Sequence, residues 1–305
     1  MITPQKPSLK ISQVAESAVR LDKYLATEYP ELSRSHLQKL IEQNLVLVNE
    51  IEAKASHKLN LGDKVKVNFP PPHQYSLIAE PIHIKIIYED ESLLVVDKPA
   101  GLVVYPASGH ASHTLINAIL AHYPDLVNID NSLRPGIVHR LDKDTSGLIV
   151  IAKNTATQQY LIDQFKARTV TKVYIILIRG KLTPKQGIIE APVGHDPFNR
   201  KRMAIVTEGR QAKTRYQVKE YLGNHTLLEV ILETGRTHQI RVHFSAIGYP
   251  VIGDAVYGVK SAYVQRQFVH AHRLGFRLPS TGEYQEFACE LPPDLTQALE
   301  IIRRK

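Results

Sequence analysis

A polar segment between two short apolar runs, within residues 134–154, constrains the fold of this chain more than any other stretch. The apolar runs, 137–138 and 148–152, are β-branched and bounded by Gly136 and Gly147, a pattern typical of buried strands. We therefore expect the polar segment between them to be a loop held by rigid strands. Loops of this kind are where catalytic and binding side chains usually lie.

This predicted loop concentrates charge, because it contains Arg140, Asp142, Lys143 and Asp144 within five residues. Loop formation alone does not require four charged side chains so close together. We therefore interpret Asp142 as the candidate catalytic carboxylate. The alternative is a surface ion pair between Asp142 and Arg140 or Lys143. A short Arg-x-Asp pattern alone would favour that alternative.

The size and composition of the chain are those of a globular protein with two domains. It has 305 residues, of which 43% are hydrophobic and 22% charged. Its single cysteine, Cys289, excludes an intramolecular disulfide and is expected to be a small buried hydrophobe. No apolar run resembles a signal peptide or reaches the length of a membrane span. We therefore expect a cytoplasmic monomer with no membrane partner.

Positive charge is concentrated around the candidate carboxylate. The formal net charge is +8, and residues 134–185 contain ten Lys and Arg against three Asp, a surplus of seven. This distribution favours a polyanionic partner, and a phosphate backbone fits it better than a small neutral substrate does.

Residues 1–72 are expected to form a loose leader, 1–18, followed by a small αβ domain with a Pro-rich linker, 19–72. Arg34 and Lys39 lie on the polar side of its second helix and are candidate substrate-binding residues. The expected elements are a short helix from Arg20 to Pro30, a helix from Arg34 to Gln43 capped by Ser33, and strands at 46–48 and 63–69.

Residues 73–305 are expected to form one larger domain in which strands dominate. Many of its strands are joined by hairpin turns, which predicts the α+β class with a mixed, largely antiparallel sheet. The expected strands are 84–88, 93–96, 171–178, 214–221, 226–232 and 269–274. The expected helices are 114–122, 155–166 and one that begins within 233–243 and is capped by Gly248.

Four stretches carry a resemblance to a known family. His-Arg-Leu-Asp-Lys-Asp-Thr-Ser-Gly-Leu at 139–148 is the most specific, and segments 97–106, 233–243 and 269–274 follow the same family order. Together they resemble the signatures of the RluA/RluD family of pseudouridine synthases. Leu-Asp-Lys-Tyr-Leu at 21–25, with the Ser-Arg-Ser and Val-x-Val-Asn that follow it, resembles the S4 RNA-binding module.

The resemblance implies that the protein isomerises uridine to pseudouridine in RNA, most like the enzymes that modify large-subunit (23S) ribosomal RNA. Asp142 would be the catalytic carboxylate, Arg241 the cation that keeps it ionised, and Tyr174 the residue that stacks on the target base. Arg140 would fill the gap left by the extruded uridine, and Lys143 would bind substrate. No metal and no cofactor is implied.

Two other functions remain open at this point: a tRNA-specific pseudouridine synthase, and a non-catalytic RNA-binding factor in ribosome assembly. The segment 253–261 is close to a phosphate-binding loop, but Val259 interrupts the pattern, so we interpret it as a turn. His238 and His243 have no third ligand at a usual spacing, which favours structural histidines.

Overall fold

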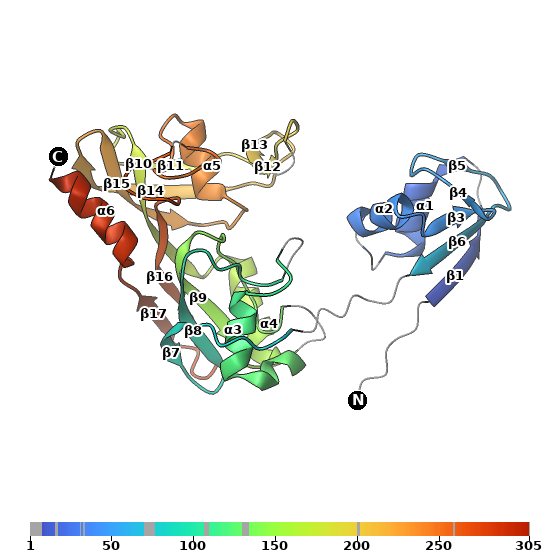
Figure 1. Cartoon of the computed structure of the whole chain (residues 1–305), viewed down its shortest axis with the longest axis horizontal. Helices are drawn as coiled ribbons and strands as arrows, with labels where there is room; N and C mark the ends of the chain where they lie inside the picture. The colour runs from blue at the N-terminus through green and yellow to red at the C-terminus, as the bar shows by residue number, and fades with distance from the viewer. Residues whose placement is uncertain are drawn as a thin grey trace. The chain divides into compact units, whose positions relative to one another are not determined.

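The computed structural model describes residues 8–15, 18–30, 32, 34–69, 77–106, 110–129, 134–199, 202–258 and 260–304 (Figure 1). The chain divides into two compact units, Met1–Tyr75 and Ser76–Lys305. Within the described ranges, no helix combines the length and the hydropathy that crossing a membrane requires.

The small unit is an αβ domain with its own hydrophobic core. Strands β1 (Ser8–Gln13), β6 (Lys64–Phe69), β3 (Val46–Val48) and β4 (Ile51–Glu52) form an antiparallel sheet in that order, and β2 (Val19–Arg20) pairs with β5 (Lys58–Leu59). The helices are α1 (Leu21–Glu28) and α2 (Arg34–Glu42). Leu21 and Leu25, one helical turn apart, pack with Leu37, Val65 and Val67 in the core.

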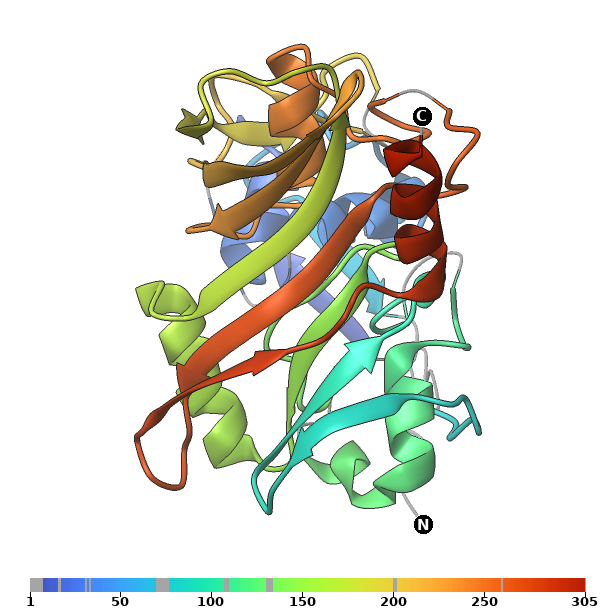
Figure 2. The same cartoon turned by 90° about the vertical axis from the view of Figure 1, so that its left-hand side faces the viewer.

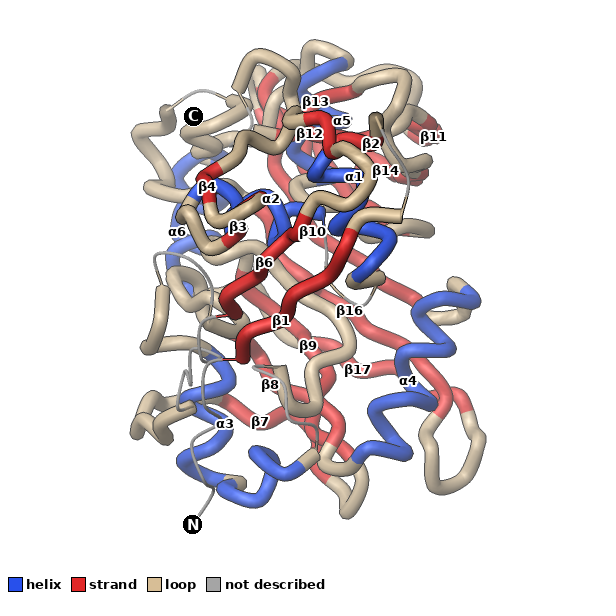
Figure 3. Tube along the Cα trace, turned by 90° about the vertical axis from the view of Figure 1, so that its right-hand side faces the viewer, coloured by secondary structure: helices blue, strands red, loops and turns tan. Residues whose placement is uncertain are grey.

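The prediction of a loose leader over 1–18 is wrong for Ser8–Gln13. These residues form β1, which pairs along the whole length of β6 (Figure 3). Leu9 and Ile11 remain 54% and 61% exposed, so the strand does not bury these apolar side chains. It is held in place by main-chain pairing with β6, which the local sequence pattern does not reveal. The predicted cap Ser33 and the prolines 70–72 lie outside the described residues.

The large unit is built on one twisted sheet, whose nine described strands follow the order β11-β14-β15-β10-β16-β9-β8-β7, with β17 paired to β16. The long strands β10, β16, β9 and β8 lie side by side across the unit (Figure 2). Within it, β16 and β9 pair in parallel and the other neighbours pair antiparallel. The predicted α+β class with a mixed, largely antiparallel sheet is confirmed.

The strands of this sheet are β7 (Lys85–Glu89), β8 (Leu93–Lys98), β9 (Ser146–Ala152), β10 (Thr171–Arg179), β11 (Gln186–Glu190), β14 (Lys213–Leu222), β15 (His225–Leu232), β16 (Val269–Arg277) and β17 (Tyr284–Ala288). A separate hairpin joins β12 (Val193–His195) to β13 (Met203–Ile205). The helices are α3 (Leu115–His122), α4 (Thr155–Ala167), α5 (Gln239–Ala246), α6 (Pro293–Arg303) and a 3₁₀ turn at Pro124–Asn128.

Alternation along β8 divides its side chains between two core clusters. Leu94 and Val96 pack in the cluster that contains α3, whereas Leu93 and Val95 pack in the cluster that contains Leu161 of α4. Because both sets are buried, residues 93–96 form an uninterrupted apolar run in the sequence, as expected for a strand covered on both faces.

The predicted strand at 137–138 is wrong. Ile137 makes a single bridge to Ile151, because the chain turns at Gly136, whose φ is +71°. A side chain at Gly136 would collide with the carbonyl oxygen of Ala152, so only glycine allows this turn beside β9. Cys289 is buried, as expected.

Candidate active site

The loop that carries Asp142 leads directly into β9, where two backbones approach closely. Gly147 has a φ of +114°, and a side chain there would collide with the backbone of Ala271 in β16. Glycine therefore permits the short parallel pairing of Ser146 and Gly147 with His270 and Ala271. This pairing fixes the end of the loop.

Two cations hold the same loop through its carbonyl groups. The fully buried Lys98 donates from Nζ to the carbonyl oxygens of Pro99, Leu102 and Lys143, at 2.8, 2.8 and 3.0 Å. Burial lowers the pKa of Lys98 to about 7. Arg266 donates from Nη1 to the carbonyl oxygen of Asp144, at 2.9 Å. The backbone that follows Asp142 is therefore anchored at two successive carbonyl groups, those of Lys143 and Asp144.

Asp142 is joined to a chain of buried charges. Its Oδ2 atom accepts a hydrogen bond from Nη1 of Arg241 at 3.0 Å, and the two side chains are 18% and 7% exposed. Arg241, on α5, also donates from Nε and Nη2 to the two oxygens of Asp254, at 2.7 and 3.0 Å. The carboxylate of Asp254 accepts the backbone N–H groups of Val256 and Tyr257. Although burial opposes charge, these donors lower the pKa of Asp254, and the two carboxylates raise the pKa of Arg241.

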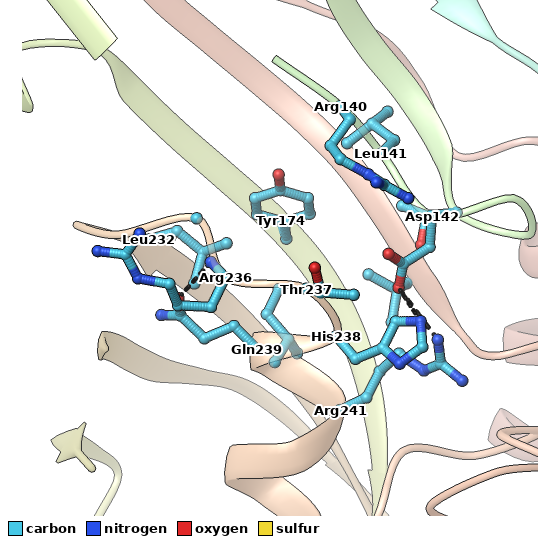
Figure 4. A pocket seen from close by; sticks show the side chains of 14 residues that line it. Arg140, Leu141, Asp142, Tyr174, Leu232, Arg236, Thr237, His238, Gln239 and Arg241 are labelled. Carbon is cyan, nitrogen blue, oxygen red and sulfur yellow. Dashed lines mark hydrogen bonds and ion pairs between the residues drawn. The ribbon is translucent and has the colours of Figure 1, made fainter. Parts of the chain in front are cut away.

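His238 lies beside Asp142, with its Nε2 atom 3.8 Å from Oδ2 (Figure 4). The ring Nδ1 atom is 2.8 Å from the hydroxyl of Tyr257, and that hydroxyl accepts the backbone N–H of Met203 at 2.8 Å. Burial lowers the pKa of His238, which favours the neutral ring. Because Tyr257 already accepts a hydrogen bond from Met203, it can donate its proton to Nδ1 and leave the N–H of His238 on the side of Asp142.

Tyr174, on β10, stands across the pocket from these charges (Figure 4). It is buried, and burial together with the charge of Asp142 raises its pKa, so the phenol stays protonated. Val269 of β16, the strand between β10 and β9, lines the same pocket. The phenol ring and the aliphatic side chain give the pocket an apolar wall.

Two pockets meet at Asp142. The Tyr174 pocket, of about 90 Å³, is lined by Asp142, Tyr174, Leu232, His238 and Arg241 among others. The Tyr105 pocket, of about 370 Å³, is lined by Tyr105 and Lys143 and shares Asp142, His238 and Arg241 with the first. A carboxylate at this junction, partly exposed and held by one guanidinium, can act as a nucleophile or base on a ligand bound in the first pocket.

The remaining predicted site residues fall into two groups. Arg140 lines both pockets and donates to the hydroxyl of Tyr105 at 3.2 Å, while Lys143 is exposed at the edge of the second pocket. Lys39 is exposed on α2 of the small unit, and Arg34 begins that helix, but its side chain lies outside the described part of the structure.

Sequence reasoning missed Asp254, Tyr257 and Lys98, and it interpreted His238, whose Nε2 atom lies 3.8 Å from Oδ2 of Asp142, as a structural histidine. The segment that holds Asp254 was predicted to be a turn, and it is one: Gly258 donates its N–H to the carbonyl oxygen of Asp254 at 3.0 Å. The available signal was an aspartate in a Gly- and Tyr-containing turn, since aspartate side chains often accept nearby backbone N–H groups. Nothing in the local pattern connected that turn to Arg241.

Sequence comparison gives two family matches. The family described as RNA pseudouridylate synthase matches residues 92–246, and the S4 domain family matches residues 19–65. An uncharacterized RNA pseudouridine synthase of Chloroflexus aurantiacus is 49% identical over 290 residues, covering 94% of this chain and 91% of that protein. Ribosomal large subunit pseudouridine synthase D of Pseudomonas aeruginosa is 41% identical over 299 residues, covering 93% and 92%.

Solved structures agree with this assignment. Human RNA Pseudouridylate Synthase Domain Containing 1 has a TM-score of 0.57 and 27% identity, over 74% of this chain and 97% of that one. Human RNA Pseudouridylate Synthase Domain Containing 4, with a TM-score of 0.58 and 24% identity, shares the fold. The chain therefore belongs to the RNA pseudouridine synthases, enzymes that isomerise uridine in RNA to pseudouridine, and it carries an S4 domain before its catalytic unit.

Proposed function

We propose that this enzyme modifies uridines of large-subunit (23S) ribosomal RNA and that Asp142 is its catalytic carboxylate. The substrate is supported by the similarity to proteins named ribosomal large subunit pseudouridine synthase D. The single observation that carries the role of Asp142 is its ion pair with Arg241 at the junction of the two pockets. We expect the enzyme to act in the cytoplasm as a monomer.

The reaction breaks the bond between N1 of uracil and C1′ of the ribose, turns the base, and joins C5 to C1′, while a proton leaves C5 and N1 gains one. Asp142 would attack C1′ or C6, or remove the 2′ proton of the ribose. Each of the three paths needs an ionised aspartate, and Nη1 of Arg241 donates a hydrogen bond to its Oδ2 atom at 3.0 Å.

The other residues have supporting roles in this proposal. Tyr174 would stack on the uracil; removal of the proton at C5 would need its phenolate, which burial and the charge of Asp142 disfavour, so we propose the stacking role alone. Arg140 would fill the gap left when the uridine leaves its stack, since it is exposed and lines both pockets. Lys143, and Arg34 and Lys39 of the S4 domain, would contact the RNA backbone.

The Asp142→Asn variant tests the catalytic assignment. We expect it to form no pseudouridine in a 23S rRNA transcript, measured by cyanoethylation and mass spectrometry, while filter retention shows RNA binding close to that of the wild type. Asp144→Asn is the matched control, because Asp144 contacts Arg266 through its backbone and should remain active. Turnover of Asp142→Asn near that of the control would refute the assignment.

The substrate is tested separately by sequencing pseudouridines in total RNA from a strain that lacks the gene. Loss of sites from 23S rRNA alone, restored by the wild-type gene and not by Asp142→Asn, is the expected result. Loss confined to tRNA would instead assign the enzyme to that substrate.

A further inference from the structure

A second group of cations surrounds a pocket next to the Tyr174 pocket. Arg168, Lys172, Arg210 and Arg236 line an open pocket of about 450 Å³, which we call the basic pocket. The two pockets share Arg140, Tyr174, Leu232, Gly235 and Arg236 in their walls. The cations come from separate parts of the chain: the end of α4, strand β10, the loop after β13 and the loop before α5.

Lys172 is the centre of this group, and its side chain is unusually enclosed for an ammonium. The residue is 8% exposed, and its Nζ atom lies 5.9 Å from the centre of the Phe165 ring. Burial, with the nearby charges of Arg168 and Arg236, lowers the pKa of Lys172 to about 8. Burial and the charges of Arg210 and Arg168 likewise lower the pKa of Arg236. The four cations therefore repel one another in a partly desolvated space.

The carboxylates near the basic pocket are already engaged elsewhere. Glu233 lines the pocket but is bound by Arg215 and by Lys213, whose Nζ atom lies 3.3 Å away. Asp142 is bound by Arg241. In the described part of the chain, none of Arg168, Lys172, Arg210 and Arg236 has a carboxylate within 4.0 Å.

The neighbouring histidine adds no charge of either sign. His139 stacks on Phe165, with ring centroids 4.6 Å apart, and its Nε2 atom accepts the backbone N–H of Val150 at 3.0 Å. Burial and the charge of Lys172 lower the pKa of His139 to about 3. An enclosed cation without a counter-charge destabilises the folded state. An anion bound beside Lys172 would supply the missing counter-charge and reduce this electrostatic cost.

We propose that the basic pocket binds a backbone phosphate of the RNA strand, next to the nucleotide whose base enters the Tyr174 pocket. Lys172 and Arg236 contact the phosphate oxygens directly, and Arg168 and Arg210 close the pocket from the solvent side. The shared wall of the two pockets sets the distance between phosphate and base, so the site positions the uridine as well as adding affinity. This inference rests on the proposed function for the identity of the RNA.

The first test is RNA binding as a function of salt. With a 23S rRNA transcript as the probe, we expect Lys172→Met and Arg236→Gln each to raise Kd about tenfold. Each should also reduce the slope of log Kd against log salt by about 0.7 to 0.9, the value for one lost phosphate contact. Arg303→Gln is the control of equal charge, because Arg303 is exposed and already bound to Glu220.

A purely structural role for Lys172 gives a different result. Removing an unpaired enclosed cation would then raise the melting temperature and leave Kd and the salt slope as in Arg303→Gln, and that outcome would overturn the proposal. If Lys172→Met does not fold, Arg236→Gln alone decides, since Arg236 lies half-buried in a loop.

The second test uses inorganic phosphate and no RNA. Lysine labelled at the ε carbon reports the protonation of Lys172 by NMR, and we expect phosphate to raise its pKa in the wild type but not in Arg236→Gln. An unchanged titration in the wild type would contradict the site. This measurement and the binding assay do not depend on pseudouridine formation, so failure of the proposed function would appear separately, as a wild-type enzyme that converts no uridine.

Discussion

Arg241 and Asp254 form a bidentate ion pair, with Nε and Nη2 of the arginine 2.7 and 3.0 Å from the two carboxylate oxygens. Asp254 is fully buried, and two backbone N–H groups fix its orientation. Asp254 therefore fixes the orientation of the guanidinium, whose remaining nitrogen, Nη1, donates to Asp142 at 3.0 Å. The position of the proposed catalytic carboxylate thus depends on a residue that touches neither pocket.

Asp254→Asn should destabilise the fold and impair the reaction. The substitution leaves Arg241 with one fewer buried counter-charge, and breaking a buried pair in this way costs about 3 to 5 kcal/mol of unfolding free energy. Urea denaturation measures the loss. Asp22→Asn, which breaks the exposed pair with Arg20, is the control and should change stability little. Equal effects of the two substitutions would contradict the structural role of Asp254.

Arg241→Lys should not rescue the loss of Arg241. One guanidinium bridges Asp142 and Asp254 through three nitrogen atoms, whereas a lysine ammonium is a single point charge that cannot reproduce this fork. We expect Arg241→Lys and Arg241→Gln to be slowed to a similar extent in single-turnover assays. A wild-type rate in Arg241→Lys, with a slow rate in Arg241→Gln, would show that the reaction needs a positive charge at this position but not the geometry of a guanidinium.

Tyr257→Phe should slow the reaction and leave RNA binding nearly unchanged. The substitution removes the hydroxyl that accepts from Met203 and holds Nδ1 of His238, so the imidazole is free to rotate beside Asp142. We expect about a tenfold lower single-turnover rate, because small displacements at a reacting centre have large kinetic effects. NMR of the ring nitrogens should show a change in the tautomer of His238. Tyr284→Phe, on β17, is the control.

Lys172→Met should change how stability depends on pH. The pKa of Lys172 is lowered to about 8 from its usual 10.5, so between these values the unfolded chain holds a proton that the folded chain has released. The free energy of unfolding of the wild type should therefore rise with pH in this window, relative to the variant, by up to about 1.4 kcal/mol per pH unit. Below pH 8 the difference should be constant. Parallel curves from pH 8 to 10.5 would contradict the enclosed state of Lys172.

Deleting residues 1–72 should leave a folded catalytic unit with weaker RNA binding. The hydrophobic clusters of the small unit contain no residue of the large one, and the Asp142 site lies wholly within the large unit. Circular dichroism should show a cooperative thermal transition, and filter retention should show a higher Kd for the 23S transcript. Aggregation of the truncated chain would place the boundary elsewhere.

Local pattern predicted most of the fold, because most strands and helices of this chain bury a regular apolar set. The prediction was wrong at Ser8–Gln13 and at Ile137, where the backbone is held by pairing or by a turn and not by a buried face, and it named neither helix α6 nor strands β11, β12 and β13. Short-range pattern contains no information on such contacts, since the partner strand lies elsewhere in the chain.

The site was predictable in part for a similar reason. Asp142 and Arg241 were found because each lies in a segment that resembles a family signature, and the structure brings them together although 99 residues separate them. Asp254 and Tyr257 belong to a turn with an ordinary composition. Their part in the site depends on tertiary contacts with α5, which a reading of the sequence cannot supply.

The close approach of Gly147 to Ala271 also determines which changes the site can tolerate. Strand β16 separates β9, which the Asp142 loop enters, from β10, which carries Tyr174. Two interstrand spacings of about 4.8 Å therefore separate the backbones of β9 and β10. Main-chain hydrogen bonds fix this separation, so core side chains can change and alter stability while the strand that the Asp142 loop enters and the strand that carries Tyr174 keep their spacing.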